Sequence, residues 1–224
     1  MKKICAIIFD LDGTLTYFKI DFMSARRQVI SKLINLGVPK GLISIEQRIL
    51  TTVEIAENYL NSRGEKPAKI KLIKKQIDKI ISQYEMEGAK QTDLIPGARE
   101  LLRILRSNNY KIGLFTLENR EVTNFLIEKC SIKSYFDSII TRDDVDNFKP
   151  HPDHLEMVLK ELDVSCNEVI VVGDNPVDIV CAKQINAIAI ARLSDRHSKK
   201  DLVQAGADYI VTNLMEINEI LKDN

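Results

Sequence analysis

The chain has 224 residues, and its 32 Lys plus Arg balance its 32 Asp plus Glu, so its formal net charge is zero. A neutral balance gives no support for a global field that would attract nucleic acid or an anionic membrane. No apolar stretch is long enough to predict a membrane span. The length suits one large domain, or one core domain that carries a smaller inserted domain.

The first predicted element is a buried strand that ends in two acids. Residues 4–9 form a continuous apolar run, and Asp10 and Asp12 follow it, with Gly13 turning the chain. The run is too short for a signal peptide, and the acids interrupt it. Ligands bind at the carboxyl ends of strands in open α/β sheets, and buried carboxylates need a cation. The pair therefore predicts a divalent metal, with one acid left for nucleophilic or proton-transfer chemistry.

Residues 20–90 show helical periodicity and no strand-like run, which predicts an all-helical block. The predicted helices cover residues 22–36, ending at Gly37; a segment that begins at Ser44, with Gln47 completing a capping-box pattern; and a segment from Pro67 to Gly88. We therefore predict a helical domain over residues 20–90, inserted into a core domain formed by residues 1–19 and 91–224.

Arg26 is the candidate functional residue of this helical block. It falls inside the apolar face formed by Phe22, Val29, Ile30 and Leu33. A guanidinium in such a position needs a partner. That partner is either a carboxylate of the helical block, which makes Arg26 structural, or an anionic group of a substrate, which Arg26 would bind in bidentate fashion.

In the second half, short apolar runs alternate with amphipathic helical segments. Strands are predicted over 110–115, 138–140, 168–172, 187–190 and 208–211, and helices near 97–107, 119–130, 152–162, 176–185, 198–205 and 214–222. Alternation of this kind predicts parallel pairing, and continuous hydrophobicity is typical of strands covered on both faces. The predicted fold class is α/β, with a doubly wound parallel sheet.

Three further polar groups follow predicted strands or lie between them. Thr116 ends the strand over 110–115, although a lone Thr there is usually an ordinary helix cap. Lys149 precedes Pro150, although most loop lysines are merely solvated. Asp174 and Asp178 stand four residues apart on one face of a helical turn, where they could bind a metal together with Asp10. His151 and His154, beside Lys149, are predicted to be loop and helix-surface residues.

Taken in chain order, four groups resemble the motifs of the haloacid dehalogenase-like superfamily: Asp10-Leu11-Asp12-Gly13-Thr14, Thr116, Lys149-Pro150 and Gly173-Asp174 with Asp178. The resemblance implies a Rossmann-like core with a helical type 1 cap, close to the phosphoglycolate phosphatase-like branch. It also implies roles for the residues. Asp10 would be the nucleophile and Asp12 the general acid and base, while Thr116 and Lys149 would bind the phosphoryl group. Mg²⁺ would be held by Asp10, the carbonyl of Asp12, Asp174 and Asp178, the last directly or through water.

The resemblance predicts a magnesium-dependent phosphatase that hydrolyses a small phosphorylated metabolite through an aspartyl phosphate. Asp12 argues against a haloalkanoate dehalogenase or a phosphonate hydrolase of the same superfamily, since both lack this acid. A sugar phosphomutase or another phosphotransferase remains an alternative. A regulatory protein without activity is a second alternative, although such proteins usually lose a catalytic acid. Glu118 departs from the usual pattern: it either points away, contacts the cap or selects a cationic substrate group.

The cysteines and the charge balance predict where the protein works and with what. The four cysteines contain no Cys-x-x-Cys pair and are predicted to be small buried thiols of a reducing cytoplasm: Cys5, Cys130, Cys166 and Cys181. The predicted partner is a small phosphate ester, with no nucleic acid and no membrane, and the predicted assembly is a monomer or a homodimer.

Overall fold

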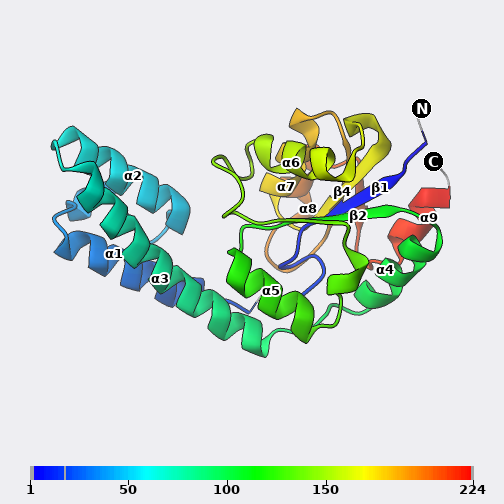
Figure 1. Cartoon of the computed structure of the whole chain (residues 1–224), viewed down its shortest axis with the longest axis horizontal. Helices are drawn as coiled ribbons and strands as arrows, with labels where there is room; N and C mark the ends of the chain where they lie inside the picture. The colour runs from blue at the N-terminus through cyan, green and yellow to red at the C-terminus, as the bar shows by residue number, and fades with distance from the viewer. Residues whose placement is uncertain (1–2, 18, 223–224) are drawn as a thin grey trace. The chain divides into compact units, whose positions relative to one another are not determined.

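The computed structural model describes residues 3–17 and 19–222. Contacts within the chain divide it into two compact units, residues 1–18 with 92–224 and residues 19–91. The first unit contains a sheet with helices and is called the α/β unit below; the second contains three α-helices and is called the helical unit (Figure 1). No helix among the described residues is long and apolar enough to cross a membrane.

The α/β unit is built on a parallel sheet whose described strands have the order β3-β2-β1-β4-β5-β6. The strands are β1 (Ala6–Phe9), β2 (Lys111–Phe115), β3 (Ser138–Ile140), β4 (Val169–Gly173), β5 (Ile188–Arg192) and β6 (Tyr209–Val211). Strand β1 lies between β2 and β4, and every residue of β1 and β4 is buried. This sheet confirms the predicted α/β class and the parallel pairing that the continuous apolar runs indicated.

Helices cover both faces of the sheet, as a doubly wound fold requires. They are α4 (Ala98–Ser107), α5 (Arg120–Lys129), α6 (Asp153–Leu162), α7 (Pro176–Gln184), α8 (Lys199–Gln204) and α9 (Glu216–Lys222). Figure 1 shows α6 and α7 on one side of the sheet and α4 and α5 on the other. On the side of α6 and α7, Ile8, Phe115, Val158 and Val171 belong to one buried apolar cluster. Short 3₁₀ turns cover Lys133–Tyr135 and Cys166–Glu168.

The helical unit contains α1 (Phe22–Asn35), α2 (Ile49–Ser62) and α3 (Pro67–Gln91), with a 3₁₀ turn over Lys40–Leu42. Its helices bury a common apolar cluster that includes Val29, Leu33, Leu60 and Ile77. Helix α1 begins where the Asp21 side chain accepts a hydrogen bond from the Ser24 N–H at 3.0 Å. The unit therefore has a hydrophobic core of its own, as expected of a domain.

Two predicted helix boundaries in the helical unit were wrong. Ser44 N–H does donate to Gln47 Oε1 at 2.9 Å, but the pair closes a turn and α2 begins only at Ile49. Gly88 does not end the third helix, which continues to Gln91. A Cβ at Gly88 would lie 3.0 Å from Ile20 Cγ1 and 3.2 Å from the Ile20 backbone, so this glycine allows the chain entering the unit to pack closely against α3.

Candidate active site

The carboxyl ends of β1, β2 and β4 lie together because the three strands are parallel and adjacent. The backbone keeps this register past the strand ends, since Asp10 N–H donates to the Val172 carbonyl at 2.9 Å and Thr116 N–H donates to the Ile140 carbonyl at 3.0 Å. Residues that directly follow these strands are thus brought to one edge of the sheet, where ligands bind in open α/β folds.

Asp10 is the centre of this group and is held from two directions. Thr14 Oγ1 donates to Asp10 Oδ2 at 3.0 Å, and Lys149 Nζ lies 2.6 Å from Asp10 Oδ1. Lys149 Nζ also pairs with Asp178 Oδ1 at 2.7 Å and donates to the Phe115 carbonyl at 3.1 Å. Burial alone would lower the pKa of Lys149, but Asp10 and Asp178 outweigh burial and hold that pKa above its ordinary value. Lys149 is therefore a fixed positive charge beside Asp10.

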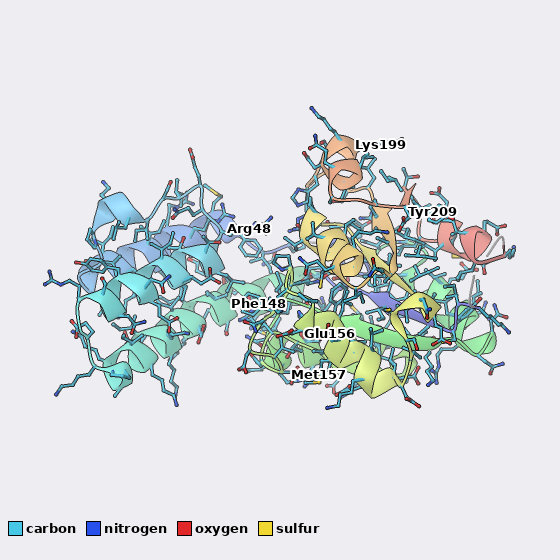
Figure 2. All side chains as sticks on the ribbon, turned by 90° about the horizontal axis from the view of Figure 1, so that it is seen from above. Arg48, Phe148, Glu156, Met157, Lys199 and Tyr209 are labelled. Atoms are coloured by element: carbon cyan, nitrogen blue, oxygen red, sulfur yellow. The ribbon has the colours of Figure 1, made fainter. Side chains whose placement is uncertain are left out.

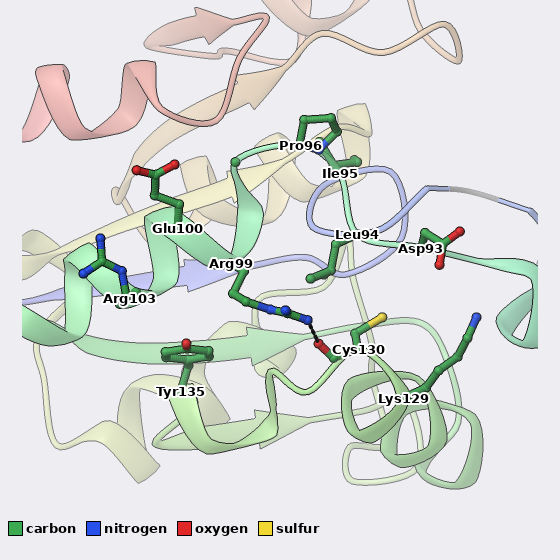
Figure 3. Close-up of a pocket in the computed structure, with 11 residues that line it drawn as sticks. Asp93, Leu94, Ile95, Pro96, Arg99, Glu100, Arg103, Lys129, Cys130 and Tyr135 are labelled. Atoms are coloured by element: carbon green, nitrogen blue, oxygen red, sulfur yellow. Dashed lines mark hydrogen bonds between the residues drawn. The ribbon is translucent and has the colours of Figure 1, made fainter.

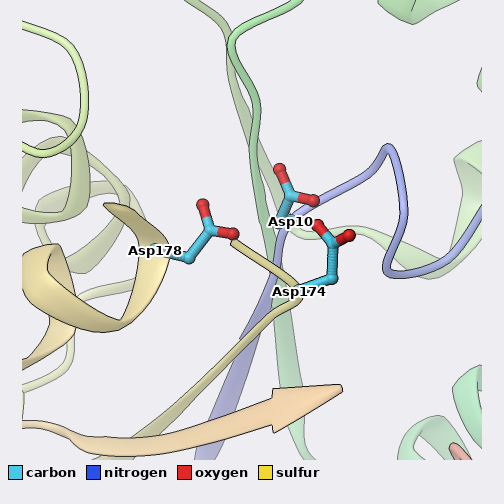
Figure 4. Close-up of side chains that lie close together, drawn as sticks. All are labelled: Asp10, Asp174 and Asp178. Atoms are coloured by element: carbon cyan, nitrogen blue, oxygen red, sulfur yellow. The ribbon is translucent and has the colours of Figure 1, made fainter. Parts of the chain in front are cut away.

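Three buried aspartates form a cluster that could hold a metal ion. Each of Asp10, Asp174 and Asp178 offers a carboxylate oxygen, and these oxygens lie within 4.8 Å of one another (Figure 4). Burial raises the pKa of Asp174 to about 6 and that of Asp178 to about 7, while Arg196 and Lys149 oppose the effect. Carboxylate oxygens are the ligands that Mg²⁺ prefers, and a divalent cation would offset the mutual repulsion of the three acids. The donor set thus fits a hard divalent cation.

Gly13 allows the turn after β1 to approach this cluster. Its backbone has φ +92°, and a Cβ at this position would lie 2.2 Å from Asp174 Oδ2. Both the left-handed conformation and the lack of space exclude a side chain here. The same turn carries Asp12, whose Oδ1 accepts a hydrogen bond from Thr16 Oγ1 at 3.1 Å. The side chain of Asp12 is not part of the three-aspartate cluster.

Asp12 has the electrostatic environment of a proton donor. The pKa of Asp12 is raised to about 6: burial is the largest cause, the charge on Asp10 adds to it, and hydrogen bonds with Glu118 and Thr16 oppose it in part. Glu118 is itself 6% exposed. Two carboxyl groups share a hydrogen bond only while one of them keeps its proton. The hydrogen bond places the Glu118 carboxyl group against that of Asp12, a contact that the sequence does not indicate.

Thr116 has a hydroxyl proton available for a ligand. Its Oγ1 accepts a hydrogen bond from the Glu118 N–H at 3.1 Å, and the side chain is buried directly after β2. Because a hydroxyl can accept one bond and still donate its own proton, Thr116 can donate toward a group bound beside Asp10.

His154 differs from its predicted position on a helix surface, since it is fully buried. Its Nδ1 accepts a hydrogen bond from the Lys149 N–H at 3.3 Å, and its Nε2 lies 3.3 Å from the Ile140 carbonyl. Burial lowers the pKa of His154 to about 3, so the ring is neutral and Nε2 carries its proton. The ring packs edge-on against Phe115, over which Lys149 Nζ lies at 3.9 Å from the centroid. His154 thus fixes the backbone that carries Lys149.

The segment between β5 and α8 supplies polar contacts that the sequence did not reveal. Ser194 Oγ donates to Asp174 Oδ2 at 2.9 Å, and Arg196 Nη1 donates to the Asp12 carbonyl at 3.1 Å. Arg192, the last residue of β5, also contributes, since its Nη1 donates to the Gly13 carbonyl at 2.7 Å. Ser194 and Arg196 occur in a polar stretch that is typical of a solvated loop, so neither spacing nor periodicity distinguishes them in the sequence.

Arg26 lies on α1 of the helical unit. Its Nη1 donates to the Ile45 carbonyl at 3.3 Å, a contact within the same unit. This bond supplies a partner of the kind that the structural interpretation requires, although the acceptor is a backbone carbonyl and not a carboxylate. A contact between Arg26 and a substrate stays a prediction.

A hollow of about 710 Å³ lies on the α/β unit, and none of the three clustered aspartates lines it (Figure 3). Residues 93–97 and side chains of α4 and α5 line it, and Arg99 Nη2 donates to the carbonyl of Cys130, another lining residue, at 2.6 Å. None of the predicted site residues lines this hollow. This hollow is therefore separate from the group of predicted site residues at the edge of the sheet.

Comparison with known proteins places this site in a family. Residues 7–191 match the family described as haloacid dehalogenase-like hydrolase. Pyrophosphatase PpaX of Oceanobacillus iheyensis is 26% identical over 99% of this chain and 99% of its own length. A phosphoglycolate phosphatase of Nitrosococcus oceani is 24% identical over 99% and 98%. The crystal structure of a putative beta-phosphoglucomutase from Thermotoga maritima has the same fold, with a TM-score of 0.66 at 23% identity over 98% of this chain and 99% of that chain.

Proposed function

The chain belongs to the haloacid dehalogenase-like hydrolase family, and we propose that it is a magnesium-dependent phosphatase acting on a small phosphorylated metabolite through an aspartyl phosphate. The observation that carries the proposal is the position of Asp10, between the fixed cation Lys149 and the acids Asp174 and Asp178. A carboxylate held in this way can attack phosphorus, because Lys149 and a bound Mg²⁺ would neutralise the charge of the incoming phosphoryl group. The names of both relatives, a pyrophosphatase and a phosphoglycolate phosphatase, also support phosphate chemistry.

The proposed reaction has two displacements at phosphorus. In the first, a carboxylate oxygen of Asp10 bonds to phosphorus, the bond from phosphorus to the ester oxygen breaks, and Asp12 gives its proton to the departing alcohol. In the second, water attacks the aspartyl phosphate, Asp12 takes the proton of the water, and inorganic phosphate and the Asp10 carboxylate are released. Lys149 and the Thr116 hydroxyl bind phosphoryl oxygens in both steps.

The proposed Mg²⁺ ligands are the carboxylates of Asp10 and Asp174 and the backbone carbonyl of Asp12. Asp178 is proposed to act through a water molecule. Asp178 suits that outer role because its Oδ2 accepts from the Asn175 N–H at 3.0 Å while its Oδ1 pairs with Lys149. When bound, Mg²⁺ would supply positive charge against the phosphoryl oxygens.

A screen of phosphate esters, with released phosphate as the readout, tests the proposal. Pyrophosphate and phosphoglycolate come first, because the named relatives suggest them, followed by sugar phosphates and nucleotides, each with Mg²⁺ and with EDTA. Acid quenching during turnover, followed by peptide mass spectrometry, should locate a phosphoryl group on the peptide that contains Asp10. Conversion of one sugar phosphate into its isomer without phosphate release would instead identify a phosphomutase.

Magnesium should stabilise the protein more at pH 8 than at pH 5. The pKa values of Asp174 and Asp178, about 6 and about 7, exceed the ordinary 3.8, so the folded protein holds these protons more tightly than the unfolded chain. Without metal, this contribution to stability is complete below pH 3.8 and is lost as the pH rises toward 7. Metal binding needs the deprotonated acids. At 100 times its dissociation constant, Mg²⁺ adds about 2.7 kcal/mol, or roughly 5–10 °C in Tm.

The measurement is the difference in Tm with Mg²⁺ and with EDTA, from pH 5 to pH 8. Taking the difference cancels the pH-dependent contribution to Tm of groups that do not contact the metal, such as the buried neutral His154. Asp174→Asn should abolish the difference at every pH. A difference that is constant across this range would contradict the assignment of the acids as metal ligands.

The role of Arg26 can be resolved by substitution. We expect Arg26→Ala to lower Tm by a few degrees, because the bond to the Ile45 carbonyl is lost at a cost of about 1–2 kcal/mol. On the alternative proposal, in which Arg26 binds substrate, the variant would raise KM for the native substrate and leave both Tm and the turnover of a small aryl phosphate unchanged. Arg27→Ala is the matched control, since Arg27 is exposed and its Nη2 contacts only the nearby Ser24 hydroxyl among the hydrogen bonds described for it.

A reducing cytoplasm is the proposed location. All four cysteines are free thiols, with Cys130 and Cys181 buried. Burial raises the pKa of Cys181 to about 12, which keeps this thiol protonated and unreactive.

A further inference from the structure

Arg196 contacts the oxygens that are proposed to bind the metal. Its Nη1 lies 3.1 Å from the Asp12 carbonyl oxygen and 3.4 Å from each carboxylate oxygen of Asp174. The Asp174 side chain is 1% exposed, whereas that of Arg196 is 29% exposed. The arginine therefore reaches a buried acid from the protein surface.

The loop that carries Arg196 is fixed at the same acid by a second residue. Ser194 Oγ donates to Asp174 Oδ2 at 2.9 Å and accepts a hydrogen bond from the Arg196 N–H at 3.3 Å. Ser194 thus fixes the backbone of Arg196 close to Asp174. The contact between the Arg196 guanidinium and Asp174 is therefore supported by the loop and does not depend on the side chain alone. The guanidinium lowers the pKa of Asp174 against the effect of burial, as a cation beside a carboxylate must.

Arg196 and a divalent cation would repel each other if both contacted the Asp12 carbonyl oxygen and the Asp174 carboxylate at the same time. Mg²⁺ binds its oxygen ligands at about 2.0–2.1 Å and requires near-octahedral geometry. A metal on the Asp12 carbonyl and on Asp174 would thus lie within a few ångströms of the guanidinium, in a partly buried setting where charges interact more strongly than in water. The N–H donors of Arg196 also occupy lone pairs on the same oxygens.

We propose that Arg196 is a built-in competitor of the metal: it holds Asp174 and the Asp12 carbonyl, and it gives up these contacts when the divalent cation binds. The inference rests on the metal site of the proposed function. Its consequence is that Arg196 weakens metal binding and couples the metal to the position of the β5–α8 loop. An anionic substrate group that draws Arg196 away from Asp174 would therefore tighten metal binding. By linkage, the bound metal would tighten the binding of that anionic group by the same factor.

Binding of Mn²⁺, followed by the electron paramagnetic resonance of the free ion, measures the coupling without any turnover. Arg196→Ala should bind Mn²⁺ on the order of tenfold more tightly than the wild type, because a unit charge at the ligand oxygens is removed. Arg196→Lys keeps the charge on a side chain with fewer donors and should fall between the two. Lys199→Ala is the matched control: it removes an equal charge from an exposed side chain at the start of α8 (Figure 2) and should change the affinity less than about twofold.

The outcomes separate this inference from the proposed function. Asp174→Asn should lose the bound ion; if it binds Mn²⁺ as the wild type does, the metal site and the inference both fail. If the wild type binds one ion, Asp174→Asn binds none, and Arg196→Ala binds with unchanged or weaker affinity, the metal site stands and the role of Arg196 is overturned. Hydrogen exchange of residues 193–198 gives a second readout: it should quicken when Mn²⁺ binds to the wild type, and slower exchange would count against displacement.

Discussion

Asp10→Asn is expected to reduce phosphate release by about 10⁴-fold or more, since the amide has no charged oxygen with which to attack phosphorus. The fold should survive the change. Lys149 can still donate to the amide oxygen. In the wild type the Thr14 hydroxyl donates to Asp10, and in the variant the new NH₂ group can donate to this hydroxyl. The substitution also removes one of three adjacent acids, which relieves repulsion.

Phosphate release, the acid-quenched phosphopeptide and Tm should be measured on the same preparation. The phosphopeptide should disappear in Asp10→Asn while Tm stays within a few degrees of the wild-type value. Asp195→Asn is the matched control, because it makes the same chemical change at an exposed acid near the site and should leave turnover unchanged. Turnover of Asp10→Asn within about tenfold of the wild type would refute the nucleophile assignment.

The architecture of the α/β unit could be predicted because its signals are local. Continuous apolar runs such as residues 169–172 are typical of strands buried on both faces, and their alternation with amphipathic segments leaves parallel pairing as the natural solution. The helix boundaries at Ser44 and Gly88 failed for a different reason. A capping pair also closes an isolated turn, and a glycine also serves close packing, as it does against Ile20. Sequence alone does not separate these uses.

The convergence of the three aspartates could be anticipated because Asp10 and Asp174 directly follow strands whose carboxyl ends share one edge, and Asp178 lies in the first turn of the helix after β4. Contacts that loops make with residues far away in the sequence could not be anticipated. Arg196 meets the carbonyl of a residue 184 positions away, and no spacing rule links the two. His154 reads as a helix-surface residue until the packing of α6 against β2 and β3 buries it beside Phe115.

Glu118 is the most instructive difference between the sequence and the structure. An acid two residues beyond Thr116 suggested a group that points away, contacts the cap or selects a cationic substrate group. In the structure, Glu118 is buried and shares a hydrogen bond with Asp12, a partner that the sequence did not indicate. This hydrogen bond lowers the pKa of Asp12, whereas burial and the charge on Asp10 raise it to about 6. The raised pKa that suits the donor of a leaving-group proton therefore comes from burial and from Asp10, and Glu118 opposes it in part.

Asp12→Asn should therefore slow the hydrolysis of alkyl phosphates by roughly 10²–10⁴-fold, the usual contribution of general acid–base catalysis. An alkoxide is a poor leaving group and needs a proton as it departs, whereas a phenolate with electron-withdrawing substituents leaves without one. The loss should consequently be much smaller for the formation of the aspartyl phosphate from an aryl phosphate. Because Asp12 also activates water in the second step, the aryl substrate should give a burst of phenol followed by slow phosphate release.

Burst kinetics on a matched pair of alkyl and aryl phosphates distinguish the two roles of Asp12. The Asn side chain can still accept the bond from Thr16 Oγ1, so the turn after β1 should keep its shape. Thr16→Val serves as the control for that bond: it removes the donor but leaves the carboxyl group, so it should not produce the burst of phenol expected of Asp12→Asn. Equal losses on alkyl and aryl substrates in Asp12→Asn, with no burst, would mean that the leaving-group proton comes from elsewhere. The buried Glu118, which shares a hydrogen bond with Asp12, would then be the next carboxyl group to test as its source.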